Sequence, residues 1–189
     1  MTFADTLEAR LAARPRTPLD WEGYRRAAVL VPLVVRGGAP AIVFTVLTAD
    51  LPTHAGQISF PGGGAEARDA DATATAVREA EEELGIDPAA VRTLGLLDDQ
   101  GTPARFVITP VVGLLGAGAE PFRPSPREVA EVFEVDVRAL RDPAVFRDLG
   151  PVERDGREYW LCAYVVGERN IWGATARIVH DLLPLLDWK

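Results

Sequence analysis

The chain of 189 residues has one cysteine, two histidines and one lysine. A single cysteine, Cys162, rules out a disulfide within the chain and fits the reducing cytoplasm. No apolar run reaches the roughly 18 residues that a membrane span needs, and the amino terminus lacks the basic and apolar segments of a secretory signal. We therefore expect a cytoplasmic protein with no membrane partner.

Positive charge is also scarce, and the formal net charge is −8. Such a balance argues against broad electrostatic binding to nucleic acid. Basic residues number 20, and Lys189 is the one lysine among them, which we interpret as a compositional bias toward arginine. Neither His54 nor His180 belongs to a Ser, Cys or Asp arrangement typical of nucleophilic catalysis. A small phosphate-bearing substrate is compatible with this composition when metal ions offset the local charge.

Acidic side chains gather in residues 78–86, which read Arg-Glu-Ala-Glu-Glu-Glu-Leu-Gly-Ile. The small and apolar residues around them recur at helical spacing. Asp71 suits the N-cap of such a helix and Gly85 suits its end. The pattern predicts a helix from Asp71 to Leu84.

The glutamates of this helix do not all face the same way. At about 100° per residue, Glu79, Glu82 and Glu83 share one stripe beside the apolar face, whereas Glu81 points elsewhere. Like charges at i,i+3 and i,i+4 repel, so a positive partner is expected. A hard divalent cation is one such partner. A solvated acidic face is the other interpretation.

A glycine run, residues 62–64, lies ahead of this helix, and glycine lets the backbone approach a phosphate or a metal closely. Together the two features resemble the Nudix box, in which Gly, five residues, Glu and seven more residues precede Arg-Glu-aliphatic-any-Glu-Glu-any-Gly-aliphatic. Residues 78–86 match the second half throughout. Counting from Gly63 places Asp69 where the pattern has Glu, with one residue inserted, whereas counting from Gly64 reaches Ala70. We prefer the Asp69 alignment.

The resemblance implies an α/β fold, the Nudix-type α/β/α sandwich with a mixed β-sheet. We expect one domain over residues 1–189, with residues 1–24 as an amino-terminal helical extension. Residues 51–59 are expected to form a loop. Strands are expected at residues 27–35, 41–47, 91–97, 106–115, 129–135 and 158–166, and further helices at residues 4–13 and 175–183.

The same resemblance implies metal-dependent hydrolysis of a pyrophosphate linkage. It assigns Mg²⁺ or Mn²⁺ to Glu79, Glu82 and Glu83, with a carbonyl from Gly62 or Gly63 completing the site. Divalent ions neutralise phosphate charge and lower the pKa of bound water.

Arg78, Glu79 and Glu83 are the implied catalytic residues. Arg78 would pair with a glutamate and hold its rotamer, unless it is an ordinary surface partner of that glutamate. The general base is left open between the box and a later loop. Glu128 and Glu131 are candidates from a region later in the chain, and each is otherwise a solvated surface acid.

Residues 51–63 read Leu-Pro-Thr-His-Ala-Gly-Gln-Ile-Ser-Phe-Pro-Gly-Gly and look like the signature upstream of the box in coenzyme A pyrophosphatases. Residues 97–99, 109–111 and 171–176 are also similar to that subfamily. This resemblance implies cleavage of coenzyme A to adenosine 3′,5′-bisphosphate and 4′-phosphopantetheine. It assigns His54, Gly56 and Gln57 to the substrate loop, although a structural turn explains them equally well.

Members of that subfamily usually carry arginines just before the His-Ala-Gly-Gln segment. Here no Arg or Lys occurs between Arg36 and Arg68, so a substrate 3′-phosphate needs another partner, such as Arg105 or Arg127. A Nudix hydrolase for another nucleoside diphosphate, such as a dinucleotide or a nucleotide sugar, is the nearest alternative. A Nudix-fold binding module without chemistry is a further one, against which the intact glutamates argue. The sequence leaves open whether the chain acts as a monomer or a homodimer.

Overall fold

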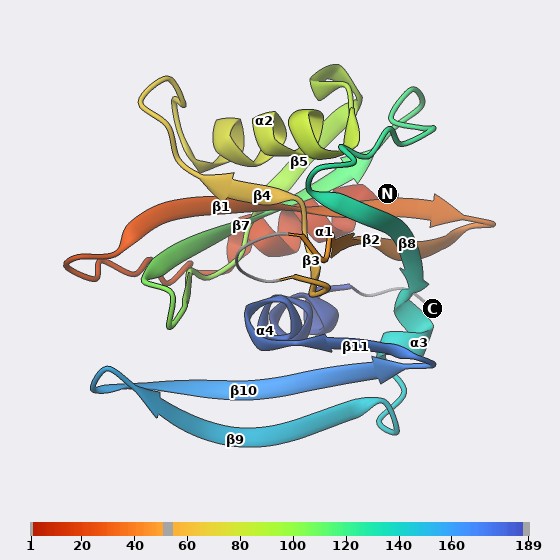
Figure 1. Ribbon diagram of the computed structural model, residues 1–189. Helices are drawn as coiled ribbons and strands as arrows, with labels where there is room; N and C mark the ends of the chain where they lie inside the picture. The colour runs from red at the N-terminus through yellow and green to blue at the C-terminus, as the bar shows by residue number, and fades with distance from the viewer. Residues whose placement is uncertain (1, 51–54, 187–189) are drawn as a thin grey trace.

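A mixed β-sheet forms the centre of the computed structural model, which describes residues 2–50 and 55–186 (Figure 1). The main path of the sheet is β3 (Ile58–Ser59), β2 (Ala39–Leu47), β1 (Arg25–Arg36), β7 (Phe106–Leu115) and β5 (Val91–Leu96). Three further strands pair beside this path: β4 (Gly62–Gly64) with β1, β6 (Gln100–Gly101) with β7, and β8 (Val129–Asp136) with β2. Strands β1 and β7 run parallel and the other pairs run antiparallel, so the predicted mixed sheet is confirmed.

Helices cover both faces of this sheet (Figure 1). On one face, α2 (Ala72–Leu84) packs its small and apolar side chains against alternate residues of β1 and β2. On the other face, α1 (Phe3–Ala13) and α4 (Gly173–Leu182) bury Leu7 and Ile178 with Val31 and Phe44. Side chains that alternate between the faces of β1 thus serve two separate cores. This arrangement is the expected α/β/α sandwich.

A second, three-stranded sheet lies beyond α4 (Figure 1). Its strands are β9 (Phe146–Arg154), β10 (Arg157–Val166) and β11 (Arg169–Trp172), all antiparallel. The short helix α3 (Val137–Leu140) leads from β8 toward it, and 3₁₀ turns occupy η1 (Pro88–Ala90) and η2 (Leu183–Leu185). Helix α4 is therefore packed between two sheets, which explains why four of its buried residues are apolar.

The segment between α1 and β1 is held against the sheet by two acidic residues. Arg14 pairs with Asp98 at 2.6 Å, and Arg16 pairs with the buried Asp99. Backbone N–H groups of residues 17 and 19 donate to the same two carboxylates. We call residues 14–21 the amino-terminal strap. Its contacts give residues 97–99 a structural role.

Two elements near the site differ from expectation. Residues 58–59, expected in a loop, pair with β2, because the Thr45 hydroxyl lies 2.9 Å from the Ser59 hydroxyl and supports a two-residue bridge. The glycine run, for which the sequence predicts no element, is a strand, because it pairs with residues 27–29 of β1. Within the described residues, none of the helices has the length and apolar character needed to cross a membrane.

Candidate metal and active site

Glu83 is the most buried carboxylate of the box, with 7% of the residue exposed. The Gly62 N–H donates to its Oε1 at 3.2 Å, while its Oε2 is buried and has no hydrogen-bond partner in the structure. Burial, together with the charges of Glu79, Glu128 and Glu82, raises the pKa of Glu83 to about 8, although the Gly62 hydrogen bond opposes this shift. A buried oxygen without a partner is costly, and a cation bound there would remove that cost.

The glycine strand β4 brings backbone directly against the box glutamates. A Cβ atom at Gly63 would lie 2.5 Å from Oε1 of Glu79, so any side chain there would displace this carboxylate. A Cβ atom at Gly62 would lie 2.4 Å from the Ala28 carbonyl oxygen, which cannot move without distorting β1. The run therefore has glycine at both positions for steric reasons, and it leaves Glu79 and Glu83 directly beside the backbone of β4.

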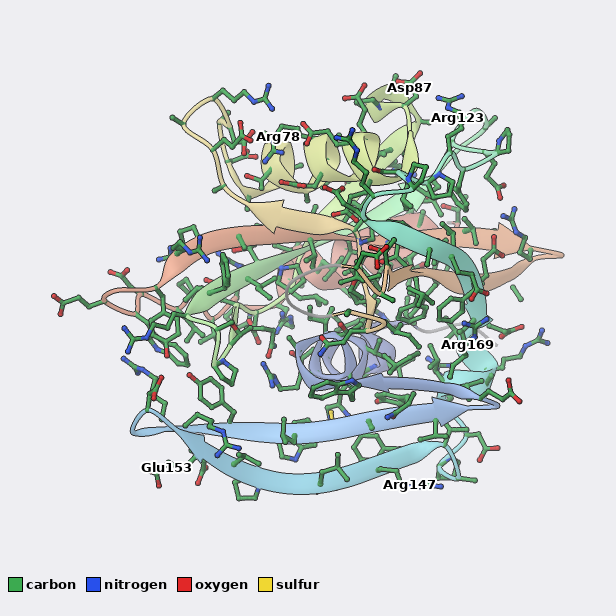
Figure 2. All side chains as sticks on the ribbon, viewed as in Figure 1. Arg78, Asp87, Arg123, Arg147, Glu153 and Arg169 are labelled. Atoms are coloured by element: carbon green, nitrogen blue, oxygen red, sulfur yellow. The ribbon has the colours of Figure 1, made fainter. Side chains whose placement is uncertain are left out.

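Arg78 fixes the other side of this group. Its Nε and Nη2 donate to the two oxygens of Asp69 at 3.0 Å each, and its Nη1 donates to Oε1 of Glu79 at 2.8 Å. Nη2 also reaches the Gly64 carbonyl at 3.1 Å. With 12% of its side chain exposed, Arg78 lies between α2 and the preceding loop (Figure 2). This geometry favours the positioning role over an ordinary surface pair.

Asp69 faces Arg78 rather than the box glutamates. Its Oδ2 also accepts from the Thr75 hydroxyl and from the Glu66 N–H, both at 2.9 Å. The hydrogen bonds from Arg78 hold the pKa of Asp69 well below its usual range. This acid thus connects Arg78 and Thr75 to the loop before α2.

The two remaining box glutamates are more exposed. Glu82 has 49% of its side chain exposed and lies 3.3 Å from Arg68 and 3.4 Å from Arg78, while Glu81 is exposed. Within residues 2–50 and 55–186, no three Asp, Glu, His or Cys side chains stand together as a ligand cluster. The structure therefore brings Glu79 and Glu83 together at β4 and leaves Glu82 at the rim.

The two candidate bases occupy different surroundings. Glu128 lies close enough to raise the pKa of both Glu79 and Glu83. Glu131 instead accepts from Arg169 at 2.8 Å, and the Arg169 guanidinium stacks over the ring of Phe133 at 4.4 Å. In Figure 2, Arg169 lies away from Arg78, on the side of β11. The geometry separates two acids that the sequence treated alike.

A cavity of about 470 Å³ opens beside Glu83. Two segments that resemble the coenzyme A subfamily line it together, residues 57–60 and residues 172–175. Gln57 is part of this wall, whereas Gly56 has φ +70° and donates its N–H to the Leu47 carbonyl, as in a turn. His54 lies outside the described residues.

Three cavity-lining regions were not identified from the sequence: residues 102–104, Tyr159 and Arg177. Each lies outside the box, and Tyr159 and Arg177 are more than 70 residues beyond it. Arg177 carried a signal, because it interrupts the apolar stretch of the final helix, but eighteen arginines elsewhere obscured it.

Oxygen donors at this site fit a hard divalent cation. The unpartnered Oε2 of Glu83 and the Glu79 carboxylate held against Gly63 are the ligand type that Mg²⁺ and Mn²⁺ prefer.

Comparisons with known proteins identify the family of the chain. Residues 24–154 match the family model described as NUDIX domain. The uncharacterized Nudix hydrolase NudL of Escherichia coli K12 is 36% identical over 183 residues, which cover 96% of this chain and 93% of the relative. NudL of Photorhabdus laumondii, likewise uncharacterized, is 36% identical over 180 residues, covering 95% and 94%.

Among solved structures, a MutT/nudix family protein from Enterococcus faecalis aligns with a TM-score of 0.51 and covers 99% of this chain and 70% of that one. At 14% identity, this likeness concerns the fold alone. The family model and the two relatives are stronger evidence, because they match most of the chain in sequence. They show that the chain belongs to the Nudix hydrolase family.

Proposed function

We propose that this Nudix hydrolase cleaves the diphosphate of coenzyme A, releasing adenosine 3′,5′-bisphosphate and 4′-phosphopantetheine. The observation that supports the proposal is the shared cavity. Residues 57–60 and 172–175 are far apart in the sequence, both resemble the coenzyme A subfamily, and both line one cavity that Glu83 also lines. A substrate whose diphosphate lies at Glu83 would place one of its halves between these segments.

Glu79 and Glu83 would hold the divalent ion, with Glu82 joining from the rim. When bound, Mg²⁺ or Mn²⁺ supplies charge neutralisation of the phosphate oxygens and lowers the pKa of a water ligand. Arg78 orients Glu79 through its 2.8 Å hydrogen bond, and the Gly62 N–H orients Glu83. Glu128, whose charge reaches both glutamates, is the proposed acceptor of the proton from the attacking water.

One observation favours a second candidate, another nucleoside diphosphate such as ADP-ribose. The segment between Arg36 and Arg68 has no basic side chain with which to contact a 3′-phosphate. Cleavage of coenzyme A and cleavage of ADP-ribose require the same chemistry at the box. The two candidate substrates therefore differ only in the half of the molecule that enters the cavity. We propose action in the cytoplasm in either case, since the one cysteine, Cys162, is buried and unpaired.

The test is a comparison of substrates with product identification. Purified protein with Mg²⁺ or Mn²⁺ is given coenzyme A, dephospho-coenzyme A, ADP-ribose and diadenosine tetraphosphate, and both products are followed by chromatography. We expect the highest kcat/KM with coenzyme A or its dephospho form, and loss of that activity in Glu83→Gln. Rapid cleavage of another diphosphate without cleavage of either coenzyme would refute the proposed substrate and leave the family assignment unchanged.

A further inference from the structure

The cavity has one cationic wall residue among those described. Of the residues that line it, Glu83 and Arg177 carry formal charge, and the remainder are neutral. Arg177 comes from α4, whereas Glu83 comes from α2 on the other side of the main sheet. The two charges therefore enter the hollow from different helices.

Arg177 is 9% exposed, and the structure pairs it with neutral groups. Its Nε donates to the Gln100 side-chain oxygen at 2.8 Å, its Nη1 to the Trp160 carbonyl at 3.2 Å, and its Nη2 to the Gly101 carbonyl at 2.8 Å. A guanidinium has five N–H donors. Two of them remain without a partner among the described residues.

The charge of Arg177 is not neutralised by direct contact with a carboxylate of the described chain. The acid nearest to it in the hydrogen-bond network is Asp181, which accepts from the amide of Gln100 at 2.8 Å. Burial lowers the pKa of Arg177 and raises that of Asp181, so neither ion is well stabilised. An anionic ligand in the cavity would supply the missing counter-charge.

The walls around Arg177 suit a nucleoside better than a flexible chain. Phe60, Phe106, Tyr159 and Trp172 all line the hollow. Bases stack readily on aromatic side chains, and guanidinium groups bind phosphate through two parallel hydrogen bonds. Aromatic walls and one buried guanidinium are what an adenosine that carries a phosphate monoester requires.

We infer that Arg177 binds the 3′-phosphate of the substrate and that the cavity holds the adenosine half of coenzyme A. The inference rests on the proposed function and names the residue that recognises the nucleotide. It replaces Arg105 and Arg127, which the sequence offered for this role. Both are exposed and neither lines the cavity, and Arg105 lies 4.0 Å from Asp155.

The first test measures binding to the unaltered protein in EDTA, where no turnover occurs. Isothermal titration calorimetry compares adenosine 3′,5′-bisphosphate, adenosine 5′-monophosphate and 4′-phosphopantetheine. We expect the bisphosphate to bind about tenfold or more tightly than the monophosphate, because one charge-assisted hydrogen bond contributes at least that factor. Equal affinities, or preferential binding of 4′-phosphopantetheine, would overturn the inference.

The second test compares kcat and KM for coenzyme A and dephospho-coenzyme A. Arg177→Gln should raise the KM of coenzyme A about tenfold or more while changing that of the dephospho form little, and Arg177→Lys should restore part of the difference. Arg105→Gln and Arg127→Gln are the matched controls and should leave the KM of coenzyme A and the KM of dephospho-coenzyme A unchanged. If Arg177→Gln raises KM or lowers kcat equally for coenzyme A and dephospho-coenzyme A, Arg177 has only a structural role and the inference is wrong.

The structural role is measured separately. Gln100→Leu removes the Nε partner of Arg177 together with the bridge to Asp181, so it should lower Tm, and any rise in KM that accompanies it should be confined to coenzyme A. If Arg177→Gln does not fold, the kinetics of Arg177→Lys and the calorimetry on the unaltered protein decide whether Arg177 binds the 3′-phosphate. Bisphosphate binding that depends on Arg177, without cleavage of coenzyme A, would refute the proposed function while supporting this site.

Discussion

At the level of single side chains, Glu81 and Glu83 lie two positions apart on α2 and have opposite surroundings. Glu83 is buried with an unpartnered oxygen, and Glu81 is exposed. We predict that Glu83→Gln or Glu79→Gln lowers kcat by about 10²–10³, since charge stabilisation of the transition state is lost. Glu81→Gln should stay within about twofold, as expected for a surface site.

Steady-state rates, with circular dichroism to verify the fold, measure this difference. Glu81→Gln serves as the control for the loss of one negative charge from the helix. Equal losses at positions 81 and 83 would contradict the orientation of the carboxylate stripe.

The titration of Glu83 makes the metal-free protein sensitive to pH. Its pKa is about 8 in the folded state against an ordinary value of 4.5. Between these values the folded state holds a proton that the unfolded state has released. The stabilising effect of that proton is fully present below about 4.5 and is lost as pH rises through about 8.

We therefore predict that, in EDTA, the urea concentration at the unfolding midpoint decreases as pH rises from 5 to 8.5. Glu83→Gln should make this decrease smaller. Mg²⁺ must displace the proton, so its affinity should rise over the same interval. A midpoint whose pH dependence is the same in both proteins would show that Glu83 does not titrate there.

At the level of elements, the loop before α2 depends on Asp69. This carboxylate joins Arg78, Thr75 and the Glu66 N–H. Asp69→Ala should lower Tm by several degrees and reduce activity less than Glu83→Gln does, because it loosens the loop and removes no metal ligand. Thermal melts and rates on the same samples provide the measurement. A larger activity loss at position 69 than at position 83 would place Asp69 among the metal ligands.

The ends of α2 show which elements the sequence can predict. The Asp71 side chain accepts from the Ala74 N–H at 2.8 Å, and Gly85 adopts φ +64° at the end of the helix. Both signals are local, because a cap needs only its own neighbours along the chain. The prediction of residues 71–84 was accordingly within one residue of the observed helix.

Strands without a local sequence pattern were harder to predict. Three consecutive glycines have low strand propensity, and β4 forms because β1 supplies its hydrogen-bond partners. Strand β9 is mostly exposed and contains Gly150 and Pro151, so its pattern lacks the alternation of a half-buried strand. The final helix begins at Gly173 rather than at residue 175, since its first turn carries no capping side chain that the sequence could reveal.

The candidate site likewise has one part that the sequence predicts and another part that it does not. The box glutamates are neighbours in sequence, so helical periodicity alone placed Glu79 and Glu83 on one stripe. The cavity draws its walls from residues as distant as Val29 and Ile178, and only the folded chain brings them together. Arg177 belongs to this second class.

At the level of the whole molecule, the amino-terminal strap connects α1 to residues 98–99 beside the main sheet. Asp99, with 1% of its side chain exposed, pairs with Arg16 and accepts from the Thr109 hydroxyl at 2.7 Å. Asp99→Asn should lower the free energy of unfolding by about 2–4 kcal/mol, because it leaves Arg16 without its buried partner.

Asp98→Asn is the matched control. The Asp98 side chain is 28% exposed, so its replacement should cost less, about 1 kcal/mol. Urea unfolding of the two variants measures both changes. A cost at Asp98 equal to that at Asp99 would contradict the role assigned to burial.

Because α4 lies near the carboxyl end of the chain, its position also sets the order in which cation binding and nucleotide discrimination arise during synthesis. The carboxylate helix, the glycine strand and β7 all precede residue 116, whereas the wall that carries Trp172 and Arg177 is translated last. A nascent chain that has emerged from the ribosome only through β8 has every box glutamate but no enclosed hollow. Attraction of a cation is thus expected to come first, and discrimination between nucleotides only after the final helix has docked.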